Sequence, residues 1–172
     1  SLSYFEGNTN TYSLKKDDRT IKVEASYLVY TDEINELIKK KLNINYEDLG
    51  YSREWLIVDI FLKSRCNLEN VFRQICDPIR PTSYVALSGS RYRYQFQLLT
   101  GEKKEEMASI SKAHDLISNW LTPNQYNIEY LSTFEFKGRC AKNFQIENFF
   151  LIGKAAYQIP PYAAQSLNSG IR

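Results

Sequence analysis

The sequence lacks a long hydrophobic run, a paired cysteine motif and a strong net charge, and each absence removes a class of protein. No apolar run approaches the roughly 20 residues that a membrane-spanning helix needs, and residues 1–11 are too polar for a signal peptide. The net charge of +2 is too small to favour a nucleic-acid partner. Cys66, Cys76 and Cys140 are an odd, widely spaced set without a CxxC pair. This pattern argues against a disulfide framework or a metal site and favours a reducing, cytoplasmic compartment.

Histidine is nearly absent as well, whereas tyrosine is abundant. The single histidine, His114, has no acid–nucleophile set around it, so we expect a surface or boundary residue rather than a catalytic base. The run 39–41 of three lysines follows an apolar helical face and is best explained as a solvated helix end. The 13 tyrosines suit strands and aromatic pockets, and strand-rich structure is the simpler explanation for most of them.

The 172 residues are enough for one domain, or for a large part of a bigger protein. Apolar spacing predicts a hairpin and further strands at 11–14, 21–24, 26–32, 54–62, 85–87, 91–98, 127–138 and 148–153. Two helices are predicted at 32–42 and 100–121, and a tyrosine-containing loop follows the first. Their apolar faces comprise Ile34, Leu37, Ile38 and Leu42, and Ile110, Ala113, Ile117 and Leu121, with Thr100 as the N-cap of the second helix.

Two strands have distinct patterns. The segment 26–32 is continuously apolar, which predicts a strand buried on both faces. The segment 91–98 alternates aromatic or leucine residues with arginine and glutamine, which predicts one packed face and one polar face. The sum is an α+β protein with a mixed, mainly antiparallel sheet, and we see no internal repeat and no low-complexity linker.

Five segments in a fixed order carry a family resemblance. They are "LVYTDEINELIKKKLNI", "EWLIVDI", "CDPIRPTSYVALSGSRYRYQFQLLTGEKKEEM", "FKGRCAKNF" and "FFLIGKAAYQIPPYAAQSLNSGIR". From about residue 11 to residue 172 the chain resembles the FAD-dependent aromatic hydroxylases, flavoprotein monooxygenases built like para-hydroxybenzoate hydroxylase. The branch acting on phenols and hydroxyphenylpropionates is the most similar.

The resemblance implies a division of the chain. Residues 1–51 would be strands and a helix of the FAD domain, 52–137 the substrate-binding sheet domain, and 138–172 the returning strand and helix of the FAD domain. The family's N-terminal GxGxxG module, which binds the ADP end of FAD, has no counterpart here. We therefore expect a truncated flavoprotein that needs a chain supplying that module, or that self-associates through the apolar surface left open.

The closing segment matches the family's glycine–aspartate motif, whose carboxylate accepts a hydrogen bond from a ribityl hydroxyl of FAD. Gly153 and Pro160 match, but Lys154 replaces the aspartate, and an ammonium group can only donate. The resemblance then places a helix start at the flavin ring. The cofactor-binding positions there are Ala164, Gln165, Ser166 and Asn168. Ala164 and Ser166 replace glycines that let the family's backbone approach the ring closely.

A second flavin motif of the family, an aspartate and glycine ending a strand, corresponds to residues 32–33. Asp32 is retained, whereas Glu33 replaces the glycine. In the substrate domain, the family's sheet covers the pocket for the phenol. The aromatic candidates for substrate contact are Tyr84, Tyr92, Tyr94 and Phe96. Only one face of the 91–98 strand can contribute, and the sequence leaves open which.

Three functions remain open at this point. The resemblance implies an oxidoreductase that hydroxylates an aromatic small molecule with FAD and NAD(P)H, of which this chain is a part or a diverged member. Such chemistry belongs to the cofactor and needs no protein nucleophile. The altered flavin motifs instead favour a non-catalytic remnant that acts as a binding module without FAD. The third hypothesis, an unrelated α+β binding domain, requires the ordered motifs to be accidental.

Overall fold

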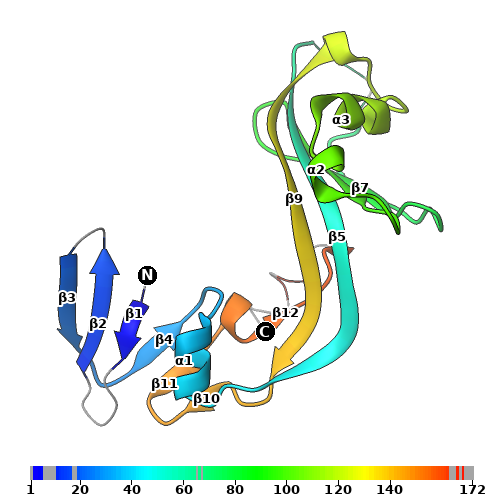
Figure 1. The fold of residues 1–172 in the computed structure, drawn as a ribbon. Coiled ribbons are helices and arrows are strands. Elements are labelled where there is room, and N and C mark those ends of the chain that lie inside the picture. The colour runs from blue at the N-terminus through cyan, green and yellow to red at the C-terminus, as the bar shows by residue number, and fades with distance from the viewer. Residues whose placement is uncertain are drawn as a thin grey trace. The chain divides into compact units, whose positions relative to one another are not determined.

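The computed structural model describes residues 2–5, 11–16, 19–64, 66, 68–162, 166 and 168. The chain forms two compact units. Unit 1 comprises 1–51, 138–160 and 165–172, and unit 2 comprises 52–137 and 161–164. Figure 1 shows the elements of each unit.

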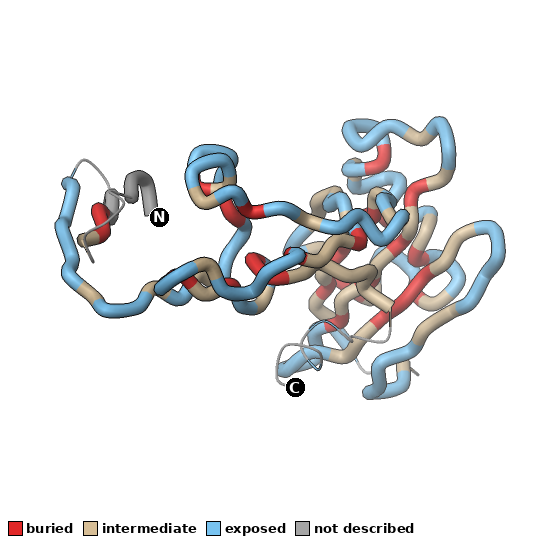
Figure 2. Tube along the Cα trace, turned by 90° about the horizontal axis from the view of Figure 1, so that it is seen from below, coloured by how far each residue is buried: buried red, intermediate tan, exposed pale blue. Residues whose placement is uncertain are grey.

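Unit 1 begins with a three-stranded antiparallel sheet in the order β1-β2-β3. Its strands are β1 (Leu2–Phe5), β2 (Thr11–Lys16) and β3 (Arg19–Glu24). The predicted hairpin is confirmed, because Thr11 pairs with Glu24 and Leu14 with Ile21. All of β3 is exposed, as Figure 2 shows, so the alternation of its residues does not produce a buried face.

A second small sheet of unit 1 brings distant segments together in the order β10-β11-β4. Its strands are β10 (Gln145–Ile146), β11 (Phe149–Leu151) and β4 (Leu28–Tyr30), and β11 and β4 run parallel. Helix α1 (Glu36–Lys41) follows β4 and begins at Asn35, whose side chain accepts a hydrogen bond from the Ile38 backbone. The three lysines form the last turn of α1, as predicted, where they complement the helix dipole.

Two expectations for this region are wrong in detail. Strand β4 is not buried on both faces, because Val29 is 53% exposed while Leu28 and Tyr30 are half-buried. Of the predicted helical face, Ile38 on α1 and Ile34 just before it are buried, but Leu37 is 75% exposed. The helix has only six residues, so only the side chains that point toward the sheet pack against apolar partners.

The largest sheet has six strands in the order β12-β9-β5-β8-β7-β6. They are β12 (Tyr157–Gln158), β9 (Tyr126–Ala141), β5 (Tyr46–Leu62), β8 (Arg91–Gln97), β7 (Thr82–Ala86) and β6 (Phe72–Ile75). The pairs β12–β9, β5–β8, β8–β7 and β7–β6 are antiparallel. The predicted loop before residue 54 is wrong in part, because β5 begins at Tyr46. Tyrosines favour strands as readily as loops.

The strand β8 alternates in burial as its sequence predicts. Its apolar side is covered by α2 (Lys104–Met107) and α3 (Ile110–Ile117), so the single helix predicted for 100–121 is in fact two. Thr100 lies in a turn and is not an N-cap. The second helix restarts at Ser109, whose hydroxyl accepts from the Lys112 backbone, and Ile110 is exposed while Ala113, Ile117 and Leu121 are buried.

Short 3₁₀ turns, η1 (Pro123–Gln125) and η2 (Gly153–Ala155), complete the elements. The predicted class, α+β with a mainly antiparallel sheet, is confirmed. In the described part of the chain, none of the helices combines the length and apolar character needed to cross a membrane.

Candidate functional site

Two of the predicted cofactor motifs meet in unit 1, at the edge where two parallel strands end. The register pairs Leu151 of β11 with Tyr30 of β4, and the Ile152 backbone N–H donates to the Tyr30 carbonyl oxygen at 3.0 Å. Both strands therefore end at the same edge, with Asp32 following one and Gly153 the other. Ligands of open α/β sheets bind outside the carboxyl ends of parallel strands, so the geometry places both motifs where a cofactor is expected.

Gly153 turns the chain away from β11. Its φ is +55°, in the left-handed region that glycine tolerates best. A Cβ atom there would lie 3.4 Å from the Thr31 carbonyl oxygen, at ordinary contact distance. The backbone conformation rather than crowding therefore favours glycine. Ala155 and Ala156, two and three residues further on, are buried.

An arginine that sequence reasoning left without a role joins the two motifs. Arg139 Nη2 donates to Glu33 Oε1 at 2.8 Å, and its guanidinium lies 4.8 Å from the centre of the Tyr46 ring. The Tyr46 hydroxyl in turn donates to the Ala155 carbonyl oxygen at 2.6 Å. Burial raises the pKa of Tyr46, while the Arg139 charge opposes that rise. The segment "FKGRC" holds this arginine, but no sequence pattern indicated its long-range partners.

The individual cofactor candidates differ in their surroundings. Asp32 is exposed, and its Oδ1 accepts from the Glu33 backbone at 2.8 Å. Lys154 is exposed and Pro160 is half-buried. Ser166 and Asn168 are exposed, and the Ser166 carbonyl oxygen accepts from the Tyr157 hydroxyl at 2.6 Å. Ala164 and Gln165 lie outside the described residues. The strand ends thus bring Asp32, Gly153 and Lys154 to one edge.

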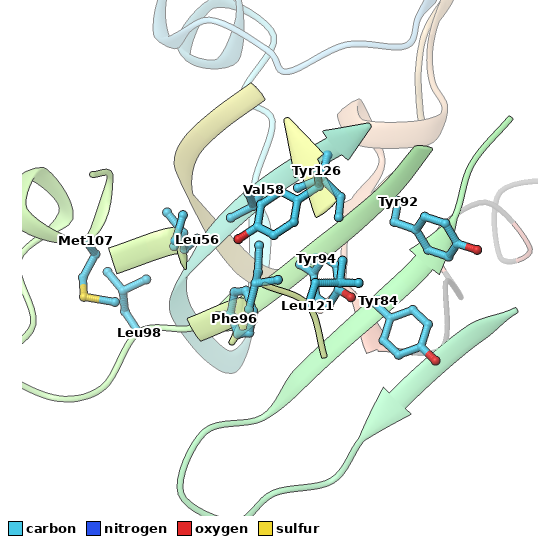
Figure 3. Packing of buried hydrophobic residues seen from close by; sticks show 13 residues of the cluster. Leu56, Val58, Tyr84, Tyr92, Tyr94, Phe96, Leu98, Met107, Leu121 and Tyr126 are labelled. Atoms are coloured by element: carbon cyan, nitrogen blue, oxygen red, sulfur yellow. The ribbon is translucent and has the colours of Figure 1, made fainter. Parts of the chain in front are cut away.

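The four substrate candidates lie in the core of unit 2. Tyr84, Tyr92, Tyr94 and Phe96 are at most 7% exposed and pack with Leu121, Met107 and other residues of the helix-covered cluster. Figure 3 shows their rings interleaved with these apolar side chains. Tyr94 lies 5.5 Å from Tyr84 and 5.9 Å from Phe96 between ring centres. Their contact with a substrate stays a prediction.

The opposite face of the same sheet is polar. Arg93 forms two hydrogen bonds to the Asp59 carboxylate, at 2.6 and 2.7 Å. The Ser83 hydroxyl donates to Gln95 Oε1 at 2.8 Å, and the Tyr162 hydroxyl donates to Gln97 Oε1 at 3.2 Å. This polar face of β8 presents amide groups beside a neutralised ion pair. The alternating sequence predicted a polar side, but not these cross-strand partners.

Other kinds of chemistry find little support in the described part of the chain. It contains no cluster of three or more His, Cys, Asp or Glu side chains arranged to hold a metal ion. His114 is half-buried, and its Nδ1 lies 2.7 Å from the Tyr126 hydroxyl. The predicted boundary position of His114 is therefore confirmed. Cys66, Cys76 and Cys140 are free thiols.

Comparison of the sequence with known proteins agrees with the expected family. The family model described as "FAD binding domain" matches residues 3–172. A probable NADH-specific resorcinol 4-hydroxylase of Rhodococcus jostii is 29% identical over 150 residues, covering 87% of this chain and 28% of that protein. The 3-(3-hydroxy-phenyl)propionate/3-hydroxycinnamic acid hydroxylase of Escherichia coli is 30% identical over 152 residues, covering 87% and 27%. The chain thus spans somewhat more than a quarter of these relatives.

Solved structures share the fold. Aklavinone-11 hydroxylase, in a complex with FAD and aklavinone, superposes with a TM-score of 0.78 at 20% identity, covering 94% of this chain and 31% of that one. The p-nitrophenol 4-monooxygenase of Pseudomonas putida gives a TM-score of 0.79 at 17% identity, covering 96% and 43%. Because the family model spans nearly all 172 residues, this chain belongs to the FAD-binding domain family.

Proposed function

We propose that this chain forms the substrate-binding sheet and one edge of the FAD site of a monooxygenase that hydroxylates phenolic rings with NAD(P)H. The supporting observation is the meeting of Asp32 and Gly153 at the ends of the parallel strands β4 and β11, within a chain matched by the FAD-binding family over residues 3–172. Residues 52–137 take the role of the substrate domain, and the flanking segments take that of the FAD domain. Three free thiols favour a reducing compartment, the cytoplasm.

The backbone at this edge fits FAD better than the side chains do. Gly153 supplies the left-handed turn, and the exposed Asp32 carboxylate is an acceptor for hydroxyl groups. Lys154 stands where the family resemblance places an acceptor, yet its ammonium group can only donate. We propose that Asp32, Gly153, Pro160, Ser166 and Asn168 contact FAD, with Ala164 and Gln165 continuing the same segment. When bound, FAD supplies the electron transfer and oxygen activation.

The polar face of β8 is our proposal for the side of the sheet that meets the ring substrate. Gln95 and Gln97 present amide groups that can hydrogen-bond a phenol. Arg93 is neutralised by Asp59, so the face carries no strong uncompensated charge. Tyr84, Tyr92, Tyr94 and Phe96 support this face from the helix-covered side, and their direct contact with substrate remains part of the proposal.

A patch of apolar side chains on unit 1 is the proposed contact surface for a dinucleotide-binding module. Tyr27, Val29, Phe150 and Ile152 form an outer face on β4 and β11, and three of them are at least half exposed. This outer face is opposite to Leu28, Tyr30, Phe149 and Leu151, which pack into the core. Among the described strands, β4 pairs only with β11, so its other edge is open for a parallel strand. The proposed occupant is a dinucleotide-binding module; self-association of this chain is the alternative.

One observation favours a second function, a binding module without FAD. The exposed Lys154 removes an acceptor and reverses the charge at a position that the family resemblance assigns to the cofactor. The substrate sheet does not depend on this position, because its core is closed within unit 2. A protein of this kind retains the sheet and loses the oxidation chemistry.

Titration of the purified chain with FAD separates the two functions. Quenching of flavin fluorescence, or a yellow protein after gel filtration, supports the hydroxylase. A colourless protein that FAD does not reconstitute supports the binding module. Lys154→Asp restores an acceptor and should tighten FAD binding by roughly 10-fold or more, the worth of a charge-assisted hydrogen bond. Lys142→Asp, an exposed lysine of the same unit, makes the same charge change away from the strand ends and should leave the affinity unchanged. Equal effects of both substitutions would contradict the assignment of position 154.

A further inference from the structure

The two turns of unit 1 that carry the cofactor motifs are each held by a side chain from a distant strand. The turn after β4 contains Glu33, whose carboxylate accepts a hydrogen bond from Arg139 of β9 at 2.8 Å. The turn after β11 contains Ala155, whose carbonyl oxygen accepts from the Tyr46 hydroxyl of β5 at 2.6 Å. Each of these contacts therefore fixes the backbone directly beyond the end of one of the two parallel strands.

The two side chains also contact each other. The Arg139 guanidinium lies 4.8 Å from the centre of the Tyr46 ring, a geometry in which the positive charge is attracted to the ring. Both residues stand on a common base, because β5 and β9 are neighbours in the largest sheet and the Lys142 backbone donates to the Asn45 carbonyl oxygen at 2.9 Å. The contacts thus run without a gap from one turn to the other, and strands support them.

The arginine at the centre of these contacts is poorly solvated. Its side chain is 22% exposed, and its Nε atom is buried without a partner among the described residues. A charge in such surroundings depends on the protein for stabilisation, since little water reaches it. Glu33, which is 64% exposed, supplies the opposite charge, and the face of Tyr46 supplies the rest. Removing either partner should therefore disturb the arginine and the turn at its other side.

We propose that Arg139 and Tyr46 form a brace that fixes the two turns relative to each other, and that both are positioning residues for the cofactor contacts of Asp32 and Gly153. Asp32 directly precedes one end of the brace, and Gly153 lies two residues before the other end. Ligand contacts made by two separate turns require a fixed spacing between them, and residues behind the site supply it. The role at the cofactor rests on the proposed function, whereas the coupling of the turns needs no FAD.

Amide hydrogen exchange of the chain without FAD, followed by NMR, tests the coupling. The Ala156 N–H donates to the Gly153 carbonyl oxygen at 3.0 Å and reports on the turn after β11. Glu33→Gln removes a charge from the other turn and should raise Ala156 exchange roughly 2- to 5-fold, the worth of a partly exposed ion pair. The Leu28 N–H, bonded to the Asn148 carbonyl oxygen at the start of β4, should exchange at an unchanged rate.

Further substitutions identify the path of the coupling. Tyr46→Phe removes only the hydroxyl and should raise Ala156 exchange roughly 2- to 10-fold. Adding Glu33→Gln to Tyr46→Phe should have no further effect, because the path between the turns is already interrupted. Glu33→Asp keeps the negative charge and should recover most of the loss. Glu24→Gln makes the same charge change on the exposed β3 and should leave Ala156 exchange unchanged.

Titration with FAD, followed by quenching of flavin fluorescence, tests the positioning role. Glu33→Gln and Tyr46→Phe should each weaken FAD binding roughly 2- to 10-fold, because the spacing of the turns is no longer fixed. Glu33→Asp should bind nearly as the parent chain does, and Glu24→Gln should bind equally well. A parent chain that does not bind FAD would contradict the proposed function, whereas the exchange measurement decides on the brace in the absence of FAD.

Four results would overturn the inference. Unchanged Ala156 exchange in Glu33→Gln excludes coupling between the turns. An equal rise at Ala156 and Leu28 indicates a general loosening of unit 1 instead of a brace. Additive effects of Glu33→Gln and Tyr46→Phe show that the coupling does not pass through the tyrosine. FAD affinity that is the same in the parent chain and in both variants excludes the positioning role.

Discussion

Unit 2 covers the apolar face of its sheet with its own helices, whereas unit 1 covers only one face of its small parallel sheet. In unit 2, the apolar side of β8 packs against α2 and α3, and the other side is polar. In unit 1, α1 packs against the inner face of β4 and β11, and the outer face of Tyr27, Val29, Phe150 and Ile152 has no cover within the described residues. Figure 2 shows the denser clustering of buried residues along the largest sheet.

This difference follows from the patterns of the strands. A strand that alternates apolar and polar residues has one face to bury, and a single helical layer is enough for it. A continuously apolar strand has two faces to bury, and six residues of α1 can cover only one of them. Within the described residues, unit 2 therefore covers the apolar face of its sheet, while the outer face of the small sheet in unit 1 stays exposed.

The largest effect is expected in the closed core of unit 2. Phe96→Ala removes a fully buried ring and should lower the free energy of unfolding by about 3–5 kcal/mol. Both tryptophans, Trp55 and Trp120, belong to unit 2, so urea unfolding followed by tryptophan fluorescence reports on this unit. Ile110→Ala, at an exposed position of α3, should change the value by less than about 0.5 kcal/mol. Similar losses for both variants would contradict a closed core.

A smaller effect is expected from an ion pair that holds two loops of unit 2 together. Glu102 accepts from Arg80 at 2.8 and 2.5 Å and from the Leu99 backbone at 2.8 Å. Glu102→Gln weakens these charge-assisted bonds and should cost about 1.5–3 kcal/mol in urea unfolding at pH 7. Glu106→Gln, in an exposed pair with Lys103, should cost less than about 1 kcal/mol.

The same carboxylate gives the acid dependence of stability. Hydrogen bonding to Arg80 lowers the pKa of Glu102 below its usual value. A carboxyl whose pKa is lowered by folding stabilises the fold above its unfolded pKa, near 4.3, and this contribution is lost as pH falls toward the folded pKa. Urea unfolding between pH 7 and pH 3 should therefore show a smaller decline for Glu102→Gln than for the parent chain. An identical decline would exclude Glu102 as a source of this dependence.

Alanine substitutions at two glycines of unit 1 distinguish an effect of backbone strain on stability from an effect on cofactor binding. Gly153 and Gly50 both have positive φ, +55° and +75°. A Cβ atom added at Gly50 would meet no atom within 4 Å, and one added at Gly153 would be at ordinary contact distance from its nearest neighbour. Replacing either by alanine should destabilise unit 1 by about 1–2 kcal/mol, measured by hydrogen exchange. If FAD binds at the strand ends, only Gly153→Ala should also weaken it. A loss of FAD affinity in both variants would show that stability, not the site, controls binding.

The smallest effect on stability is expected at the outer face of unit 1. Val29→Asp should change the free energy of unfolding by less than about 0.5 kcal/mol, because the side chain is exposed. It should nevertheless reduce self-association at high concentration, measured by analytical ultracentrifugation, because it places a charge in the apolar patch. Leu37→Asp, at an exposed position on α1, is the control and should leave association unchanged. A parent chain that stays monomeric at high concentration would contradict self-association through the outer face.

Much of the local structure could be predicted from the sequence. The hairpin of β2 and β3 and the two-faced strand β8 follow from alternation, which depends only on neighbouring residues. The split of the helix at Ser109 could not be predicted in this way, since a periodic apolar face continues on both sides of the break. Nor could the early start of β5 at Tyr46, because its pairing partner β9 lies some eighty residues away in the chain.

The candidate site likewise contains residues that the sequence identified and residues that only the structure revealed. Asp32, Gly153 and Lys154 were found by motif, whereas Arg139 and Tyr46 became visible only through their contacts. The four substrate candidates were chosen for being aromatic, and the fold places them in the core, on the side of the sheet opposite to the polar face of β8. Composition identifies rings, but it does not say which face of a sheet a helix will cover.

The sequence by itself determined the family, the α+β class and the substitution of a donor for an acceptor at position 154, because these depend on residue identity and order. Only the tertiary structure decided that β4 and β11 end at one edge, that Arg139 joins their turns and that the four substrate candidates lie in the core of unit 2. Each of these arises from contacts between residues distant in the chain. Such contacts are fixed by the packing of whole elements, and no local pattern encodes them.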